Sequence, residues 1–104
     1  MSIEEITLEE ASKGFAAFDS PQRLKIFREL VKSEPVGLTH GNLQNFCNIP
    51  ASTLTHHLRI LLDSRVISSH RSGRTIWYRA DFAAVEALMH YLKANCCAYS
   101  ETER

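Results

Sequence analysis

Three cysteines are the most reactive side chains of this 104-residue chain, and two of them are neighbours. Cys96 and Cys97 lie near the C-terminal end, and Cys47 lies in the middle of the sequence. An odd number with two adjacent is not the pattern of a disulfide scaffold, and a bond between neighbours would strain the peptide that joins them. We therefore expect free thiols in a reducing cytoplasm, able to bind soft, thiophilic ions.

A second set of polar side chains lies on a predicted helix over residues 51–64. Because a helix turns by about 100° per residue, its leucines share one side. Ser52, His56 and Arg59 lie roughly opposite, and Thr53, Thr55 and His57 lie on the flanks. Such groups bond phosphates and base edges, which predicts a DNA-binding face. Its members are Ser52, Thr53, Thr55, His56 and Arg59. Adjacent histidines point apart on a helix, so we expect His56 exposed and His57 partly buried rather than a metal site.

A predicted β-hairpin follows directly. Residues 66–70 and 75–79 are rich in β-branched and aromatic side chains, and Gly73 between them can supply a positive φ. Arg71 and Arg74 are placed at the tip of this hairpin. Arginines on a protruding ribbon can reach phosphates or a minor groove, so both join the predicted DNA contacts.

Five helices must position these groups, over about residues 8–18, 21–33, 40–47, 51–64 and 82–95. The predicted caps are Thr7 (or Ser2 one turn earlier), Ser20, Thr39 and Asp81. The apolar residues expected to face the core from the first three helices are Leu8, Ala11, Phe15 and Phe18, then Leu24, Phe27, Leu30 and Val31, then Leu43, Phe46 and Cys47. The fold class is mostly α with a small β-hairpin, a winged helix-turn-helix in one domain over residues 1–104.

Charge and composition narrow the class of protein. The net charge is zero, but residues 1–20 hold five acidic side chains and one lysine, while residues 51–80 hold five arginines and one aspartate. A local basic block favours an anionic partner such as nucleic acid. No apolar run is long enough to span a membrane, and the acidic start is not a secretory signal. No nucleophile–base set, phosphate loop or carboxylate pair indicates an enzyme.

The chain resembles the ArsR/SmtB family of metal- and metalloid-sensing repressors. The resemblance covers nearly the whole chain and is strongest in residues 18–27, 52–61 and 73–79, which include the Ser-Thr-x-Thr-x-His-Leu stretch and the Gly-Arg wing. It implies a homodimer, built by the first and last helices, that represses its operon until an inducer binds. The last helix supports a dimer independently, because its apolar residues surround more than one face. They are Phe82, Val85, Leu88, Met89, Tyr91 and Leu92.

The resemblance also narrows the inducer. Thr39 and Gly41 stand where the family's third-helix Cys-x-Cys site would be, and Asp81 is followed by Ala83 where its last-helix zinc site has histidine. Asn95-Cys96-Cys97 is similar to the ending of arsenite-responsive members. The expected ligands are therefore Cys96 and Cys97, the expected inducer is trivalent arsenic or antimony, and no permanent cofactor is required.

Several alternatives remain open at this point. A third thiol ligand is missing, because Cys47 is expected in the core; two thiols suit a methylated trivalent arsenical, or a small-molecule thiol could complete the site. The pair could instead sense oxidation, or have no role. A winged helix that contacts only proteins is a further hypothesis.

Overall fold

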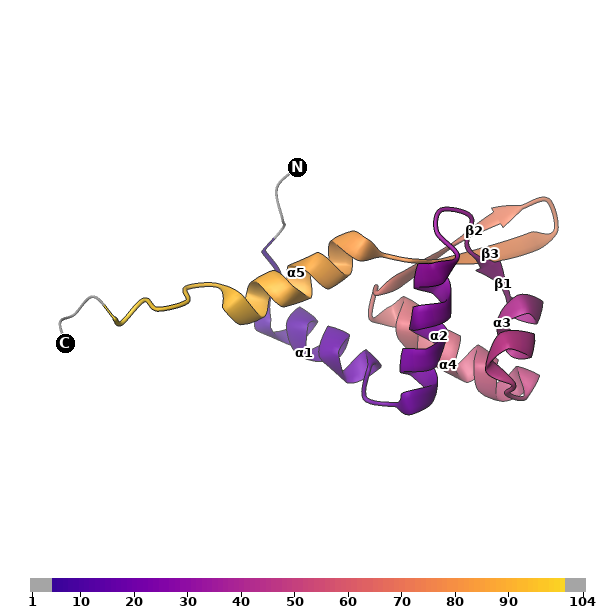
Figure 1. The fold of residues 1–104 in the computed structure, drawn as a ribbon, viewed down its shortest axis with the longest axis horizontal. Coiled ribbons are helices and arrows are strands. Elements are labelled where there is room, and N and C mark those ends of the chain that lie inside the picture. Colours follow the sequence, from indigo (N-terminus) through magenta and orange to yellow (C-terminus); the bar gives the residue numbers. More distant parts are fainter. Residues whose placement is uncertain (1–4, 101–104) are drawn as a thin grey trace.

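The computed structural model describes residues 5–100 and contains five helices and a three-stranded sheet. In chain order the elements are α1 (Leu8–Ala17), α2 (Pro21–Lys32), β1 (Leu38–Thr39), α3 (His40–Cys47), α4 (Ala51–Asp63), β2 (Ile67–Ser72), β3 (Thr75–Ala80) and α5 (Phe82–Lys93). The molecule is elongated, with extents of 59 × 28 × 22 Å. α2, α3, α4 and the sheet gather at one end, whereas α1 and α5 lie together at the other (Figure 1). We call residues 20–80 the compact half and residues 5–17 with 82–100 the arm.

The helix starts lie at the predicted caps. Thr7 and Thr39 each form a complete capping box at the starts of α1 and α3. The Ser20 hydroxyl accepts a hydrogen bond from the first turn of α2, and the Asp81 carboxylate accepts one from the first turn of α5. Side chains of this kind satisfy N–H groups that have no partner within the helix. The alternative start at Ser2 lies outside the described residues.

The predicted hairpin is confirmed, and a third strand is added to it. β2 pairs antiparallel with β3 from Ile67–Ala80 to Ser72–Thr75, and β1 pairs with the other edge of β3. The sequence indicated only a stub of strand at β1. Gly37 precedes it with φ +90°, and a Cβ at this position would collide with the Tyr78 carbonyl oxygen. A glycine therefore permits the close approach of β1 to β3.

Most of the core lies in the compact half, it extends to Ala11, Ala17 and Leu88 of the arm, and it differs in part from the predicted set. Ile26 and Leu30 of α2 are fully buried, whereas Leu24 and Val31, which we expected to face inward, are exposed. These four side chains form two stripes on different sides of α2, and helical spacing alone does not tell which stripe meets the neighbouring elements. Phe46 of α3 is also exposed, which corrects its predicted place in the core.

The arm is held together by small residues. Ala11, Gly14 and Ala17 are the buried residues of α1, and a Cβ on Gly14 would lie 2.7 Å from Leu88 Cδ2 of α5. Their small size therefore permits the two helices to approach closely. On the outer side of α1, Leu8 and Phe15 are exposed, although their spacing predicted burial.

α5 carries large apolar side chains toward solvent as well. Phe82, Met89 and Leu92 are exposed, with 69% of Leu92 accessible. The helix ends at Lys93, two residues before the predicted end, and residues 94–100 continue as turns. Within residues 5–100, none of the helices has the length and apolar character that a membrane crossing requires.

Candidate nucleic-acid interface and thiol site

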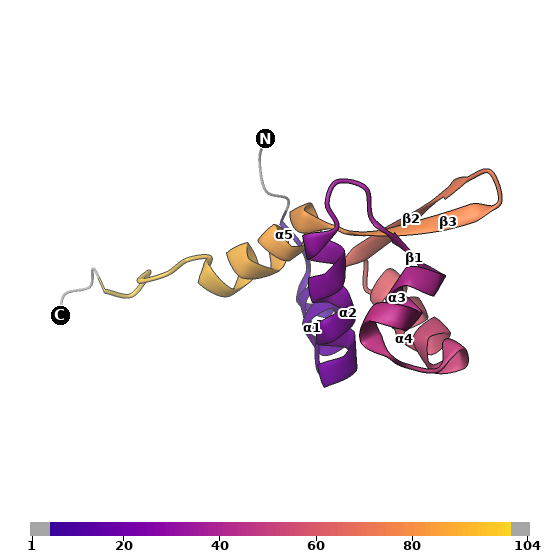
Figure 2. The same ribbon diagram turned by 45° about the vertical axis from the view of Figure 1, so that its right-hand side comes forward.

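α4 presents an apolar side to the core and a polar side to solvent. Leu54, Leu58 and Leu61 are buried, as the helical sorting predicted. On the polar side the structure leaves Ser52, Thr55, His56 and Arg59 exposed and Thr53 half-buried. α3 lies beside α4 in both views (Figures 1 and 2), which gives the two-helix arrangement of a helix-turn-helix.

The start of α4 offers backbone N–H groups in addition to the predicted side chains. Pro50 occupies the N-cap position and makes no side-chain capping bond. The first N–H groups of α4 therefore remain available to an acceptor from outside the helix. A phosphate is the acceptor that the positive end of a helix dipole favours.

The wing brings two arginines to the protruding edge of the sheet. Ser72 pairs with Thr75, so the turn consists of Gly73, with φ +65°, and Arg74. We expected Arg71 at the tip of the hairpin. It lies instead within β2, where it pairs with Ile76. The strand ladder extends further than the β-propensity of the residues indicated, because backbone pairing continues through polar residues. Both arginines are exposed.

His57 belongs to a polar network behind the polar side of α4. Its Nε2 lies 2.8 Å from Gln22 Oε1, and its Nδ1 lies 3.3 Å from Arg23 Nη1. Since arginine can only donate, Nδ1 accepts and Nε2 carries the proton that is donated to Gln22. Arg23 Nε also donates to the Ala17 carbonyl oxygen at 2.7 Å. The network thus joins the end of α1, the start of α2 and the recognition helix α4.

Burial confirms the expectation for the two histidines. His57 is only 8% exposed, and His56 is exposed. Desolvation, then Arg23, then His56 lower the pKa of His57, so the neutral form is favoured. A neutral imidazole suits the network, because protonation of Nδ1 would replace its bond with Arg23 by repulsion.

One contact beside this face was missed by the sequence analysis. His40, the first residue of α3, places Nε2 3.0 Å from Thr55 Oγ1. The two residues are 15 positions apart, and no spacing rule connects them. The signal that was available is indirect: Thr39 was predicted to cap α3, which puts His40 in the first turn of the helix that packs on α4.

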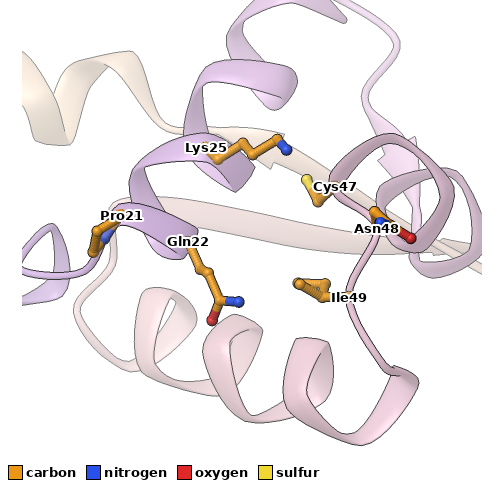
Figure 3. A pocket seen from close by; sticks show the side chains of 6 residues that line it. All are labelled: Pro21, Gln22, Lys25, Cys47, Asn48 and Ile49. Carbon is orange, nitrogen blue, oxygen red and sulfur yellow. The ribbon is translucent and has the colours of Figure 1, made fainter.

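Cys47 is a core residue, as predicted. It is buried at the end of α3, and its sulfur lines a hollow of about 210 Å³ together with Gln22, Lys25 and Ile49 (Figure 3). Burial, and after it the charge of Glu29, raise the pKa of the Cys47 thiol. A protonated, enclosed thiol is a poor nucleophile and a poor metal ligand.

Cys96 and Cys97 form an exposed pair of free thiols in the turns beyond α5. Their sulfur atoms are 2.9 Å apart. The backbone has left helical geometry, as this closeness requires: Asn95 and Cys97 both have positive φ, 63° and 65°. The hydrogen bond with Cys97 raises the pKa of the Cys96 thiol.

The thiol pair has no third ligand from the described part of this chain. Among residues 5–100, no three side chains of His, Cys, Asp or Glu gather in a way that could hold a metal ion. Cys47 lies at the end of α3 in the compact half, at the opposite end of the molecule from the tail that carries the pair (Figure 1). Two sulfurs are therefore what one chain offers to a thiophilic atom.

The geometry defines a class of protein: a winged helix-turn-helix with an exposed polar recognition helix. A family model described as a helix-turn-helix domain matches residues 18–70. The transcriptional repressor SdpR of Bacillus subtilis (strain 168) is 32% identical over 78 residues, which cover 75% of this chain and 83% of SdpR.

Solved structures show the same fold. An ArsR-like transcriptional regulator from Rhodococcus sp. RHA1 aligns with a TM-score of 0.80 at 22% identity, covering 89% of this chain and 85% of that protein. The winged helix-turn-helix domain of Mb0332 from Mycobacterium bovis, described as homodimeric, aligns with a TM-score of 0.67 at 17% identity, covering 92% and 84%. The chain belongs to the helix-turn-helix domain family that the family model describes, and its relative SdpR is a transcriptional repressor. Its relatives are regulators, which confirms that it is not an enzyme.

Proposed function

We propose that this protein is a homodimeric repressor that binds operator DNA and releases it when a trivalent arsenic or antimony species binds Cys96 and Cys97. The observation that carries the DNA-binding part is the exposed polar side of α4, in a chain whose wing carries two further exposed arginines. The observation that carries the inducer part is the exposed thiol pair with a sulfur–sulfur distance of 2.9 Å.

The electrostatics of the compact half favour DNA as the partner. Arg59, Arg71 and Arg74 are exposed there, and arginine is the side chain best suited to phosphates and guanine edges. The remaining polar side chains of α4 are short, so the helix can approach a major groove closely. This arrangement favours DNA over the alternative of a module that contacts only proteins, because the exposed side chains of the polar side of α4 are short polar groups and an arginine and include no aromatic residue of the kind that anchors protein interfaces.

The arm favours a dimer. Leu8 and Phe15 on α1, with Met89 and Leu92 on α5, are large apolar side chains that a single chain leaves exposed. A second copy that packs against the arm would cover them, and a two-fold axis there would present both recognition helices to one duplex. The homodimeric relative Mb0332 supports this assembly.

The chemistry of the pair suits a trivalent arsenical with two exchangeable hydroxyls. Two arsenic–sulfur bonds form, two arsenic–oxygen bonds break, and each leaving hydroxide takes up one thiol proton as water, with no change of oxidation state. Because each thiol proton leaves with the departing hydroxide during the exchange, the raised pKa of Cys96 lowers the fraction of thiolate without blocking the overall reaction. Two ligands suit a methylated arsenical, whose third valence is occupied; arsenite or antimonite would keep one hydroxyl or take a small-molecule thiol.

The position of the pair offers a route to release. Residues 94–100 follow α5 directly, and α5 packs on α1. Bridging the two sulfurs by one atom fixes the turn at the end of α5 and can tilt that helix within the dimer. Because α5 is part of the dimer surface, the spacing of the two recognition helices would change.

The test is a fluorescence-anisotropy titration of a duplex selected from random sequence by the wild-type protein. Arsenite, antimonite and trivalent methylarsenical should each be added to wild type, Cys96→Ser, Cys97→Ser and Cys47→Ala. We expect release from the wild type and Cys47→Ala, and unchanged DNA binding without release from Cys96→Ser and Cys97→Ser. Release of Cys96→Ser by the arsenical would contradict the ligand assignment.

A parallel arm with hydrogen peroxide separates the two thiol chemistries. The raised pKa of Cys96 disfavours the thiolate, which is the form that peroxide oxidises. We expect the complex to persist in peroxide. Release by peroxide that dithiothreitol reverses, together with no effect of arsenicals, would replace the arsenic proposal with a redox one.

A further inference from the structure

Thr55 is the residue of the DNA-facing side of α4 whose hydroxyl has two partners within the protein. Its Oγ1 lies 3.0 Å from the Ala51 carbonyl oxygen, one turn earlier on α4. It also lies 3.0 Å from Nε2 of His40 on α3. The side chain is nonetheless exposed, so it remains within reach of a duplex that lies along the helix.

Counting protons fixes what this hydroxyl can still do. A threonine hydroxyl has one proton to donate and two lone pairs to accept with. If His40 carries its proton on Nε2, then His40 donates to Oγ1 and the Thr55 proton goes to the Ala51 carbonyl oxygen. If His40 carries its proton on Nδ1, then Nε2 accepts the Thr55 proton. In both cases the hydroxyl proton is used inside the protein and at least one lone pair stays free.

A hydroxyl in this state discriminates among DNA groups. Phosphate oxygens, guanine N7 and O6, and thymine O4 all accept hydrogen bonds, so none of them can bond a group that has only a lone pair to offer. The major-groove donors are the exocyclic amines, N6 of adenine and N4 of cytosine.

The surroundings of Thr55 supply the complementary donor. Thr55 and His40 line a hollow of about 210 Å³ with Arg59, Asp63 and Tyr78. Arg59 lies one turn after Thr55 on the same side of α4 and has only donors. Thr55 as acceptor and Arg59 as donor therefore face the groove together, and they read opposite properties of the bases.

We propose that Thr55, locked by His40 and Ala51, is an acceptor-only specificity residue that selects adenine or cytosine at one position of each half-site. His40 is a positioning residue in this arrangement, since it acts on DNA through Thr55. The inference rests on the proposed DNA-binding function and adds to it the chemical class of base that is read.

The experiment is a selection of duplexes from a randomised pool by the wild-type protein and by variants, followed by sequencing. Thr55→Val has nearly the same shape without the acceptor, and Thr55→Ser keeps it. We expect the wild type and Thr55→Ser to prefer adenine or cytosine at one half-site position by about tenfold, and Thr55→Val to lose that preference. Ser52→Ala is the matched control: it removes another exposed α4 hydroxyl and should leave this position unchanged.

His40→Ala tests the lock itself. Without His40 only the Ala51 carbonyl oxygen holds the hydroxyl proton, so the hydroxyl should turn toward the duplex more often, and guanine or thymine should be enriched more than with the wild type. An unchanged preference would remove His40 from the proposal. A wild type that selects guanine or thymine there, or a Thr55→Val variant with an unaltered base preference at every position, would overturn the inference while leaving DNA binding intact. A wild type that enriches no sequence would overturn the proposed function itself.

Discussion

The compact half and the arm differ in the burial of their large apolar side chains, because those that one chain buries fully all lie in the compact half. In the compact half, Ile26, Leu43 and Leu54 are fully buried, and the buried histidine of α4 has a partner on each ring nitrogen. In the arm, Leu8 and Leu92 are among the most exposed apolar residues of the described chain. The compact half therefore has a core of its own in one copy, whereas the arm leaves apolar side chains that a second copy would cover under the proposed function.

Truncating one leucine to alanine in each region tests this difference most directly. Leu54→Ala removes a fully buried side chain from α4 and should lower the free energy of unfolding by about 2–5 kcal/mol at every protein concentration. Leu92→Ala removes a side chain that is 69% exposed in one chain, so its effect should appear only where dimers form. Urea denaturation at several protein concentrations measures both; equal, concentration-independent losses would mean that the arm is not an interface.

A charge placed on the arm should separate assembly from folding. Leu92→Glu is expected to yield a folded monomer whose affinity for a two-site operator falls by about a hundredfold or more, because the second half-site no longer binds intramolecularly. Sedimentation and a DNA titration report the two effects. Val36→Glu, which alters an equally exposed apolar residue of the compact half, should remain dimeric.

Removal of an arginine from the polar side of α4 tests whether the compact half binds DNA. Arg59→Ala should weaken operator binding by about 1–3 kcal/mol while leaving the dimer intact. Arg28→Ala, which removes an exposed arginine from α2, should bind as the wild type does. Anisotropy titrations at two salt concentrations test this, and an equal loss for both variants would indicate that only overall charge matters.

The smallest expected effect is a decrease of the free energy of unfolding at acidic pH. The pKa of His57 lies below its ordinary value of 6.5 in the folded protein, chiefly through burial, so the unfolded chain binds the proton more readily. Stability contributed by neutral His57 is therefore present above about pH 6.5 and is lost as the pH falls below it.

Urea denaturation between about pH 7.5 and about pH 5.5 measures this loss. His57→Gln, whose amide can both accept from Arg23 and donate to Gln22, should lose less of its free energy of unfolding over this pH range than the wild type. His56→Gln removes the exposed neighbour and should lose as much as the wild type. An identical loss in all three proteins would exclude His57 as its source.

The sequence predicted those parts of the fold that local chemistry decides. Thr7, Ser20 and Asp81 cap helices as their side chains require, and Gly73 forms the turn of the wing. The buried face of α2 was not predictable, because the helix carries two apolar stripes. Which of them is buried depends on how elements distant in the sequence pack against it. Leu24 was assigned to the core and lies outside it.

The candidate site was predictable to the extent that exposure follows from helical periodicity. The polar side of α4 was expected from spacing, whereas Cys96 and Cys97 were singled out by their resemblance to the ending of arsenite-responsive family members. The contact between His40 and Thr55, and the network of Gln22, Arg23 and His57, join residues that are 15 to 35 positions apart. Such contacts depend on how α2 and α3 lie against α4, which no local pattern encodes.

The proposal that the compact half binds DNA and the arm binds the inducer is tested most directly by one measurement. It is the mass of the protein–operator complex in solution, with and without a trivalent methylarsenical. We predict two chains per duplex in its absence, and free duplex with an arsenic-loaded dimer in its presence; Cys96→Ser should keep two chains on the duplex in both. One chain per duplex, or a wild-type complex that persists with arsenic bound, would contradict the account.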